Sequence, residues 1–108
     1  MIVEATNYFA KDGDTSAVLE QRRRATAIRV SLGLAPGKVL VKIEGDGPDV
    51  RWECAFASLE DYEIDRAARK ASKDFEMSRK KMLTLVDRFE RHISADDGHF
   101  PPPEQRVS

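Results

Sequence analysis

Asn7 and Trp52 are the first side chains of this sequence whose types and positions suggest chemistry. Residues 2–10 alternate as a strand does, and the alternation predicts that the Asn7 amide lies among apolar neighbours on the helix-covered side. A buried amide without a partner costs about 1–3 kcal/mol, so a ligand or a backbone group must satisfy it. Trp52, on the same face of a neighbouring strand, would supply an apolar wall. The pair predicts a small-molecule site, or else an amide bonded to backbone at a strand irregularity.

Other aromatic and charged residues extend this set of candidates. Tyr8 and Tyr62 are candidates to contact a ligand of that site. Glu4, Lys42 and Glu53 are predicted on the opposite face of the sheet, where a second subunit would take them out of water and prepare them for acid or base work. A ladder of cross-strand ion pairs, each worth under about 1 kcal/mol, accounts for the same charges without catalysis.

Several classes of function lack the residues that they need. One cysteine and two histidines do not make a structural zinc set, so we expect no metal and no cofactor. The GDGPD segment at residues 45–49 is too short for a phosphate loop, and no helix is predicted after it. The arginine run at 22–24 is expected on a solvated helix face, and Cys54 is expected to be a small buried hydrophobe.

Nucleic acid and membrane partners are not expected either. Eighteen Lys and Arg balance nineteen Asp and Glu, which leaves no overall field to attract nucleic acid or anionic lipid. No stretch approaches the ~20 apolar residues of a membrane span, and residues 1–10 lack the pattern of a leader. We therefore expect a cytoplasmic protein.

The elements that must position these residues begin with a β-hairpin at residues 38–58, KVLVKIEGDGPDVRWECAFAS. With Gly45 opposite Val50, apolar residues meet on one face and opposite charges meet on the other. The apolar pairs are Ile43 with Trp52, Val41 with Cys54 and Val39 with Phe56, and the charged pairs are Glu44 with Arg51 and Lys42 with Glu53. A slip of one residue would set charges against apolar residues, so the pattern predicts this register.

The segments around the hairpin predict one strand before it and helices on both sides. The strand at residues 2–10 is followed by a helix that begins at Asp14 or Thr15 and ends at Gly33. After the hairpin, the periodicity is helical from Ser58. A fresh N-cap at Ser72 predicts a break there, which makes two consecutive helices.

The last helix is expected to run almost to Ile93, because apolar residues recur along it at helical spacing. Its stripe consists of Phe75, Met82, Val86, Phe89 and Ile93. A fourth strand would then be short or absent, at most residues 91–94. Residues 95–108 contain three consecutive prolines and predict an extended C-terminal tail.

This order predicts an α+β, ferredoxin-like βαββα(β) domain over residues 1–94, with an antiparallel sheet and helices on one face. The residues expected toward the helices are Val3, Ala5, Asn7, Phe9, Val39, Val41, Ile43, Trp52, Cys54 and Phe56. Those expected on the open face are Ile2, Glu4, Thr6, Tyr8, Leu40, Lys42, Glu44, Arg51, Glu53, Ala55 and Ala57. The open face is then too apolar for permanent exposure, which predicts a homodimer that pairs two such faces.

Four segments carry a resemblance to a known superfamily: the opening MIVEATNYFAKDG, the LGL and PGK before the second strand, WECAFAS in the third, and the terminal helices ending in RFERHI. Together they resemble the dimeric α+β barrel superfamily, over roughly residues 1–94. That group includes the antibiotic-biosynthesis monooxygenases, the NIPSNAP-like proteins and the stress-responsive barrel proteins. The resemblance implies a homodimer whose two sheets close a barrel, and a small apolar or aromatic ligand.

The same resemblance bears on the site. An Asn on the first strand together with a Trp also occurs in the cofactor-independent oxygenases and the haem-degrading members of the group. Haem degradation would need an axial histidine on the second helical region, and the sequence has none between Leu59 and Arg91. His92 comes at the expected helix end, where the helix dipole accounts for it. The resemblance therefore implies no haem.

Three functions remain open from the sequence. The leading hypothesis is a homodimeric barrel protein of unknown role that binds a small apolar or aromatic molecule near Asn7 and Trp52. A cofactor-independent monooxygenase or isomerase is the first alternative, with Asn7 orienting an enolate oxygen and Tyr8 or a nearby carboxylate moving a proton. The second alternative is a structural or assembly module whose cleft is filled by Phe9, Trp52 and Tyr62.

Overall fold

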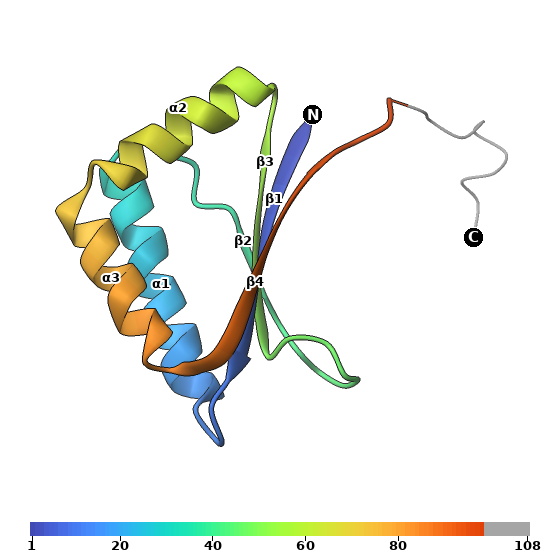
Figure 1. The fold of residues 1–108 in the computed structure, drawn as a ribbon, viewed down its shortest axis with the longest axis vertical. Helices are drawn as coiled ribbons and strands as arrows, with labels where there is room; N and C mark the ends of the chain where they lie inside the picture. The colour runs from blue at the N-terminus through green and yellow to red at the C-terminus, as the bar shows by residue number, and fades with distance from the viewer. Residues whose placement is uncertain (99–108) are drawn as a thin grey trace, which may run out of the picture.

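Four strands and three helices make up residues 1–98, the part of the chain that the computed structural model describes. The strands are β1 (Ile2–Ala10), β2 (Lys38–Val41), β3 (Val50–Phe56) and β4 (Val86–Ala95), and the helices are α1 (Thr15–Ser31), α2 (Leu59–Lys70) and α3 (Lys73–Leu83). The strands form one antiparallel sheet in the order β2-β3-β1-β4. All three helices cover one face and leave the other bare (Figure 1). This arrangement confirms the predicted ferredoxin-like α+β fold.

Local signals set the starts of the three helices, and the end of α1, where the sequence predicts them. The Ser58 hydroxyl accepts a hydrogen bond from a backbone N–H of the first turn of α2, at 3.1 Å. The Ser72 hydroxyl does the same for α3, also at 3.1 Å, so two consecutive helices form. Helix α1 follows the N-cap Asp14, and Gly33 after its end has a φ of 77°, which favours glycine.

Strand β4 is longer than predicted and takes residues that were expected in a helix. Helix α3 ends at Leu83, and β4 pairs with β1 along its whole length. The spacing of four between Phe89 and Ile93 suits a helix, but an even spacing also places both side chains on one face of a strand. Pairing with β1 satisfies the backbone groups along an edge that would otherwise stay open. This tertiary requirement overrides the helical pattern.

The hairpin of β2 and β3 forms in a register four residues from the predicted one. Val39 lies opposite Trp52 rather than opposite Phe56. Strand β2 therefore ends at Val41, and Ile43 lies in the turn with its side chain 97% exposed. Because a shift by an even number keeps each side chain on its face, Trp52 still points toward the helices as predicted.

Asp49 explains why the turn is longer than the local pattern suggests. Its N–H donates to the Tyr8 carbonyl at 3.0 Å, and its carboxylate accepts from the Ala10 N–H at 2.9 Å. The same carboxylate lies 3.4 Å from the Lys42 ammonium. These contacts anchor the end of the turn to β1, and pairing the hairpin sequence with itself could not reveal them.

The prediction for the two faces of β1 is wrong. Directly opposite residues of antiparallel strands point the same way, and Thr6 lies opposite Trp52 while Glu4 lies opposite Cys54. Glu4, Thr6 and Tyr8 therefore point toward the helices. The open face receives Val3, Ala5, Asn7 and Phe9 instead. Each of the two sets of alternating β1 residues contains both polar and apolar side chains. Hydrophobicity alone therefore could not decide which set faces the helices.

The core lies between the sheet and the helices. Its buried residues come from three strands and all three helices: Tyr8, Val18, Val50, Trp52, Cys54, Phe56, Tyr62, Met82 and Val86. Of the predicted tail at residues 95–108, Ala95 belongs to β4 and residues 99–108 lie outside the described part of the chain. The domain boundary at residue 94 stays a prediction.

Candidate functional site

A cavity of about 550 Å³ lies between the helical layer and the sheet. Strands β1, β3 and β4 supply one wall, and all three helices supply the other. Its apolar lining consists of Ala25, Trp52, Phe75, Met82, Leu83 and Phe89. Three of the residues singled out in the sequence, Glu4, Tyr8 and Trp52, line this cavity.

Trp52 is held in one position by its polar edge and by cations over its ring. Its indole Nε1 donates to the Pro36 carbonyl at 2.9 Å, and its side chain is 1% exposed. The guanidinium carbons of Arg22 and Arg29 lie 4.7 and 4.8 Å from the indole ring centroid. Contacts of this kind add cation–π attraction to the burial of the ring. The indole is therefore a fixed part of the cavity wall.

Arg22 is buried, although the arginine run at 22–24 was expected on a solvated face. Its Nη1 donates to the Tyr8 hydroxyl at 3.1 Å, and both residues line the cavity. Its Nε and Nη2 are buried without a hydrogen-bond partner among the described residues. The sequence contains a signal for this burial, because Arg22 is four residues after Val18 and three before Ala25, both of which are buried.

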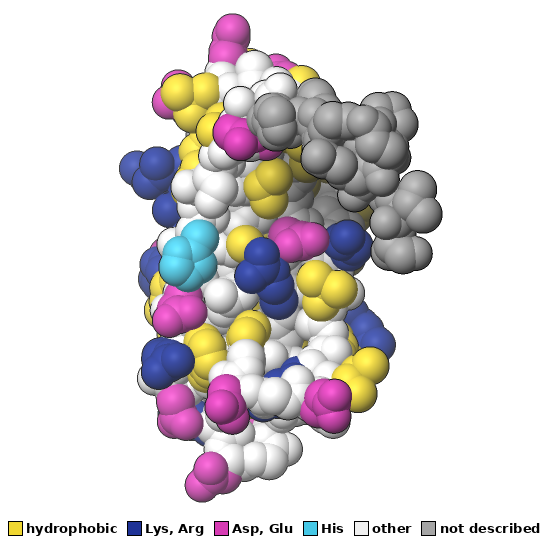
Figure 2. Space-filling model, turned by 90° about the vertical axis from the view of Figure 1, so that its right-hand side faces the viewer, with side chains coloured by type: hydrophobic (Ala, Val, Ile, Leu, Met, Phe, Trp, Pro, Cys, Tyr) yellow, Lys and Arg dark blue, Asp and Glu magenta, His cyan; other side chains and the backbone are white. Residues whose placement is uncertain are grey.

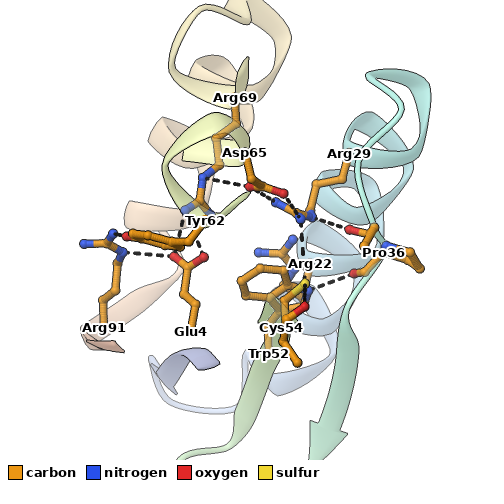
Figure 3. A network of polar contacts seen from close by, with 12 residues as sticks. Glu4, Arg22, Arg29, Pro36, Trp52, Cys54, Tyr62, Asp65, Arg69 and Arg91 are labelled. Atoms are coloured by element: carbon orange, nitrogen blue, oxygen red, sulfur yellow. Dashed lines mark hydrogen bonds and ion pairs between the residues drawn. The ribbon is translucent and has the colours of Figure 1, made fainter. Parts of the chain in front are cut away.

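Glu4 is the centre of a buried ionic cluster on the helix side of the sheet (Figure 3). Arg69 Nη2 lies 2.8 Å from Oε1 and donates to Oε2 at 3.0 Å. Arg91 Nε donates to the same Oε2 at 3.0 Å, and Arg91 Nη2 donates to the Tyr62 hydroxyl. Glu4 was predicted inside the dimer barrel, but it lies on the other side of the sheet. Tyr62 reaches the cavity wall only through its bond to Arg91.

A second buried ion pair joins α1 to α2. Arg29 is completely buried, and its two terminal nitrogens donate to the Asp65 carboxylate at 3.0 and 2.7 Å. Its Nε donates to the Ala35 carbonyl at 2.7 Å, so every nitrogen of this guanidinium has an acceptor. Asp65 also lies 3.6 Å from Arg69, which links the two ion clusters (Figure 3). Sequence reasoning did not identify Arg29 or Asp65.

Basic side chains outnumber acidic ones around the cavity. Its acidic lining residues are Glu4 and Glu76, and its basic lining residues are Arg22, Arg66, Arg69, Lys70, Arg79 and Arg91. Arg69 and Arg91 pair with Glu4, and Arg79 pairs with Glu76 at 2.7 Å. The cavity therefore has an excess of positive charge, which favours an anion over a cation.

Asn7 does not line the cavity, which corrects the first expectation of the sequence. It lies on the open face, where its Oδ1 accepts from Arg51 Nη1 at 3.3 Å. Its Nδ2 donates to the Glu90 carboxylate at 3.5 Å. Cross-strand side chains satisfy the amide, so no ligand is needed to explain it.

Glu53 lies on the open face as predicted, and Lys42 lies beyond the end of β2. The Glu53 carboxylate accepts from Arg51 at 3.1 Å and lies 3.4 Å from the Lys38 ammonium. The bond from Arg51 holds the pKa of the Glu53 carboxyl below its ordinary value of 4.5. The predicted contact of Lys42 with Glu53 does not form, because Lys42 pairs with Asp49.

Cys54 and His92 have different surroundings. Cys54 is buried as expected, and burial raises the pKa of its thiol above the ordinary value of 9.0, which makes it a poor nucleophile. His92 was expected at a helix end but belongs to β4, with its Nε2 3.7 Å from the Glu90 carboxylate. It has no role at the cavity, whose lining residues do not include it.

Two further features of residues 1–98 bear on the class of site. No three or more His, Cys, Asp or Glu side chains gather there in a way that could hold a metal ion. None of the three described helices is both long and apolar enough to cross a bilayer.

Comparisons with known proteins find likeness in structure rather than in sequence. No family model matches the chain, and no curated protein matches its sequence. An uncharacterized NIPSNAP domain protein from Burkholderia xenovorans has a TM-score of 0.73 and 13% identity, over 94% of this chain and 100% of its own. An antibiotic biosynthesis monooxygenase has a TM-score of 0.66 and 13% identity, over 89% of this chain and 98% of its own.

A third solved structure bears on assembly. A dimeric protein of unknown function with a ferredoxin-like fold, from Bacteroides fragilis, has a TM-score of 0.64 and 10% identity, over 86% of this chain and 93% of its own. Identities this low show a common fold and do not show a common activity. The chain therefore has a ferredoxin-like fold, and it shares that fold with a NIPSNAP domain protein and an antibiotic biosynthesis monooxygenase.

Proposed function

We propose that this protein binds a small molecule with an apolar or aromatic body in the cavity between helices and sheet. The cavity itself supports the proposal most directly, because a volume of about 550 Å³ lies within the ordinary range of ligand sites. Aromatic and aliphatic side chains line it beside a few polar groups, which is the usual composition of such a site. Trp52, the only tryptophan of the sequence, forms part of its wall.

Trp52 emission tests this proposal. A panel of apolar and aromatic compounds is titrated, and binders are expected to change the emission in a saturable way. Filling the cavity with Ala25→Leu should weaken binding, because Ala25 lines it from α1. The matched control is Ala27→Leu, two residues along on the exposed side of the same helix. Equal affinities of the two variants, or a panel that leaves Trp52 emission unchanged, would contradict the proposal.

An enzymatic use of the same cavity is the second candidate. The structural neighbour that is an antibiotic biosynthesis monooxygenase favours it, together with the Tyr8 hydroxyl on the cavity wall. A cofactor-independent monooxygenase or isomerase would use Tyr8 to move a proton. Asn7 cannot orient an enolate here, because it lies on the opposite face of the sheet. Oxygen uptake with anthrone-like or quinol substrates tests this candidate, and unchanged turnover by Tyr8→Phe would remove Tyr8 from it.

The structural alternative loses the packing that it required. Phe9 was expected to help fill the cleft, but it lies on the open face, where the guanidinium carbon of Arg88 is 3.9 Å from the centroid of the Phe9 ring. A cavity remains between the layers without it. A role without any ligand would be supported by failure of the whole compound panel.

The open sheet face supports the proposal of a homodimer. Figure 2 shows apolar side chains on this face interspersed with charges of both signs rather than gathered in one patch. Leu40 and Ala55 lie on this face and are exposed, and pairing two such faces about a two-fold axis would bury them. The neighbour from Bacteroides fragilis is described as dimeric.

Light scattering tests the dimer. The expected particle has twice the chain mass of 12.2 kDa, and a particle of one chain mass would refute the proposal. Leu40→Lys should weaken the dimer, because it adds a charge without a partner to the paired faces. The control is Ile43→Lys, which places the same charge on the exposed turn beyond β2. An equal effect of both variants would place the interface elsewhere.

A further inference from the structure

Arg22 stands apart from the other buried cations of the protein. Its side chain is 4% exposed, and its Nε and Nη2 have no hydrogen-bond partner among residues 1–98. Burial of a cation without acceptors or a counter-charge costs several kcal/mol. The protein with such a residue is either less stable, or it binds a ligand that supplies the missing negative charge.

Arg29 shows what the same chain does with a buried arginine that has a structural role. It comes seven residues after Arg22 on the same side of α1, and its guanidinium lies at a similar distance from the Trp52 ring. All three of its nitrogens have protein acceptors, two of them in the Asp65 carboxylate. Arg22, which lines the cavity, has only the Tyr8 hydroxyl. The unmatched charge is therefore found where a ligand could lie.

The Tyr8 hydroxyl connects that charge to the cavity. Its oxygen accepts from Arg22, and its own proton has no acceptor among the described residues. A hydroxyl that accepts from a guanidinium donates more strongly to an anion, because hydrogen bonds in a chain polarise one another. Arg66 and Lys70, also on the cavity wall, have no carboxylate within ion-pair distance in the described chain.

We propose that the ligand of this cavity is an organic acid. Its carboxylate accepts the Tyr8 proton over the positive charge of Arg22, and its apolar body extends along Phe75, Met82 and Phe89. This inference depends on the proposed function and names the chemical class of its ligand. A neutral compound of the same shape would gain the apolar contacts and would lose the charged hydrogen bond.

A matched pair of ligands tests the inference on the wild-type protein. Calorimetry compares 4-phenylbutanoate with 4-phenylbutan-1-ol, which share the phenyl group and the alkyl chain and differ in the charged end. We expect the acid to bind at least about tenfold more tightly, because a hydrogen bond to a charged group contributes more than one between neutral groups. Equal affinities would overturn the anion inference and leave the proposed function standing. Binding of neither compound, with a silent panel on Trp52, would overturn both.

Three variants locate the carboxylate. Tyr8→Phe removes a single oxygen, and Arg22→Met removes the charge with most of the side chain volume kept. Each should abolish the preference for the acid, because the acid loses a charged hydrogen bond and the alcohol loses at most a neutral one. Arg79→Met is the control, because Arg79 is on the same cavity wall but is half exposed and already paired with Glu76. If Arg79→Met loses the preference and Tyr8→Phe keeps it, the carboxylate lies at the cavity rim and this inference is wrong. Circular dichroism verifies folding, and Tyr8→Phe decides alone if Arg22→Met does not fold.

Discussion

The two faces of the sheet hold their charged residues in opposite ways. On the helix side, the Glu4 side chain is 1% exposed, and its carboxylate lies between the guanidiniums of Arg69 and Arg91. On the open face, the Glu53 side chain is 25% exposed, and its carboxylate pairs with Arg51 and Lys38, both of which reach water. Water can replace a lost partner on the open face, but it has little access to the helix side. Single substitutions should therefore have large effects on one face and small effects on the other.

The largest effect is expected from Glu4→Gln. The amide keeps the shape of the carboxylate, but it leaves Arg91 without a counter-ion and leaves Arg69 with only the Asp65 carboxylate, at 3.6 Å. Removal of one partner from a buried ion cluster costs about 3–5 kcal/mol, and urea unfolding measures it. The control is Glu20→Gln, which breaks an exposed pair with Arg24 on α1. A Glu4→Gln variant as stable as the control would mean that the buried cluster is not what distinguishes the two faces.

The pair of Arg29 and Asp65 sharpens the comparison with a second buried cluster. Arg29→Met alone should cost about 3 kcal/mol, because it removes the two short bonds to the buried Asp65 carboxylate and leaves it only the more distant Arg69, at 3.6 Å. Adding Asp65→Leu should restore part of that loss, since two apolar side chains need no partners. Unfolding free energies of both single variants and the double variant give the coupling energy. Additive losses would show that the two side chains do not act as a pair.

Gly37→Ala should have an intermediate effect, through the packing that holds Trp52 on the helix side. Gly37 has a φ of 72°, and an added Cβ would lie 2.8 Å from the Glu53 carbonyl oxygen and against the indole Nε1 of Trp52. Strain of this kind costs about 1–3 kcal/mol. Gly45→Ala is the matched control, because Gly45 also has a positive φ but open space around it. The midpoint of thermal unfolding should be lower for Gly37→Ala than for Gly45→Ala. The reverse order would contradict the close approach of Gly37 to Trp52 and Glu53.

Local rules predicted the parts of the fold that depend on neighbouring residues in the chain. The caps at Ser58 and Ser72 are examples, because each needs only a hydroxyl and an N–H three residues later. The register of β2 and the extent of β4 depend on contacts with β1, which lies far away in the sequence. No pairing of the hairpin with itself contains that information.

The site was partly predictable for a related reason. Trp52 and Tyr8 line the cavity, and an aromatic wall was the correct expectation for Trp52. Strand alternation with Val3, Ala5 and Phe9 predicts the Asn7 amide on the helix side, whereas the structure places the Glu4 carboxylate there. A rule based on hydrophobicity cannot anticipate a carboxylate whose counter-ion, Arg69, is 65 residues away.

The smallest effect, and the one with a pH signature, is expected from Glu53→Gln on the open face. The bond from Arg51 lowers the pKa of the Glu53 carboxyl in the folded protein below its ordinary value of 4.5. A lowered folded-state pKa contributes stability that is present above the unfolded-state value and is lost as pH falls through the folded-state value. At neutral pH, Glu53→Gln should therefore cost under about 1 kcal/mol, as exposed pairs do.

Urea unfolding of wild type and Glu53→Gln, followed from neutral pH into acid, measures this difference. The two curves should converge once Glu53 is protonated in the folded wild type, because both side chains are then neutral. Arg51→Gln should show the same convergence, since it removes the main cause of the shift. A difference that persists in acid would assign the loss to packing rather than to charge. A loss as large as that of Glu4→Gln would show that the open face is as dry as the helix side, which in this fold requires a second subunit over it.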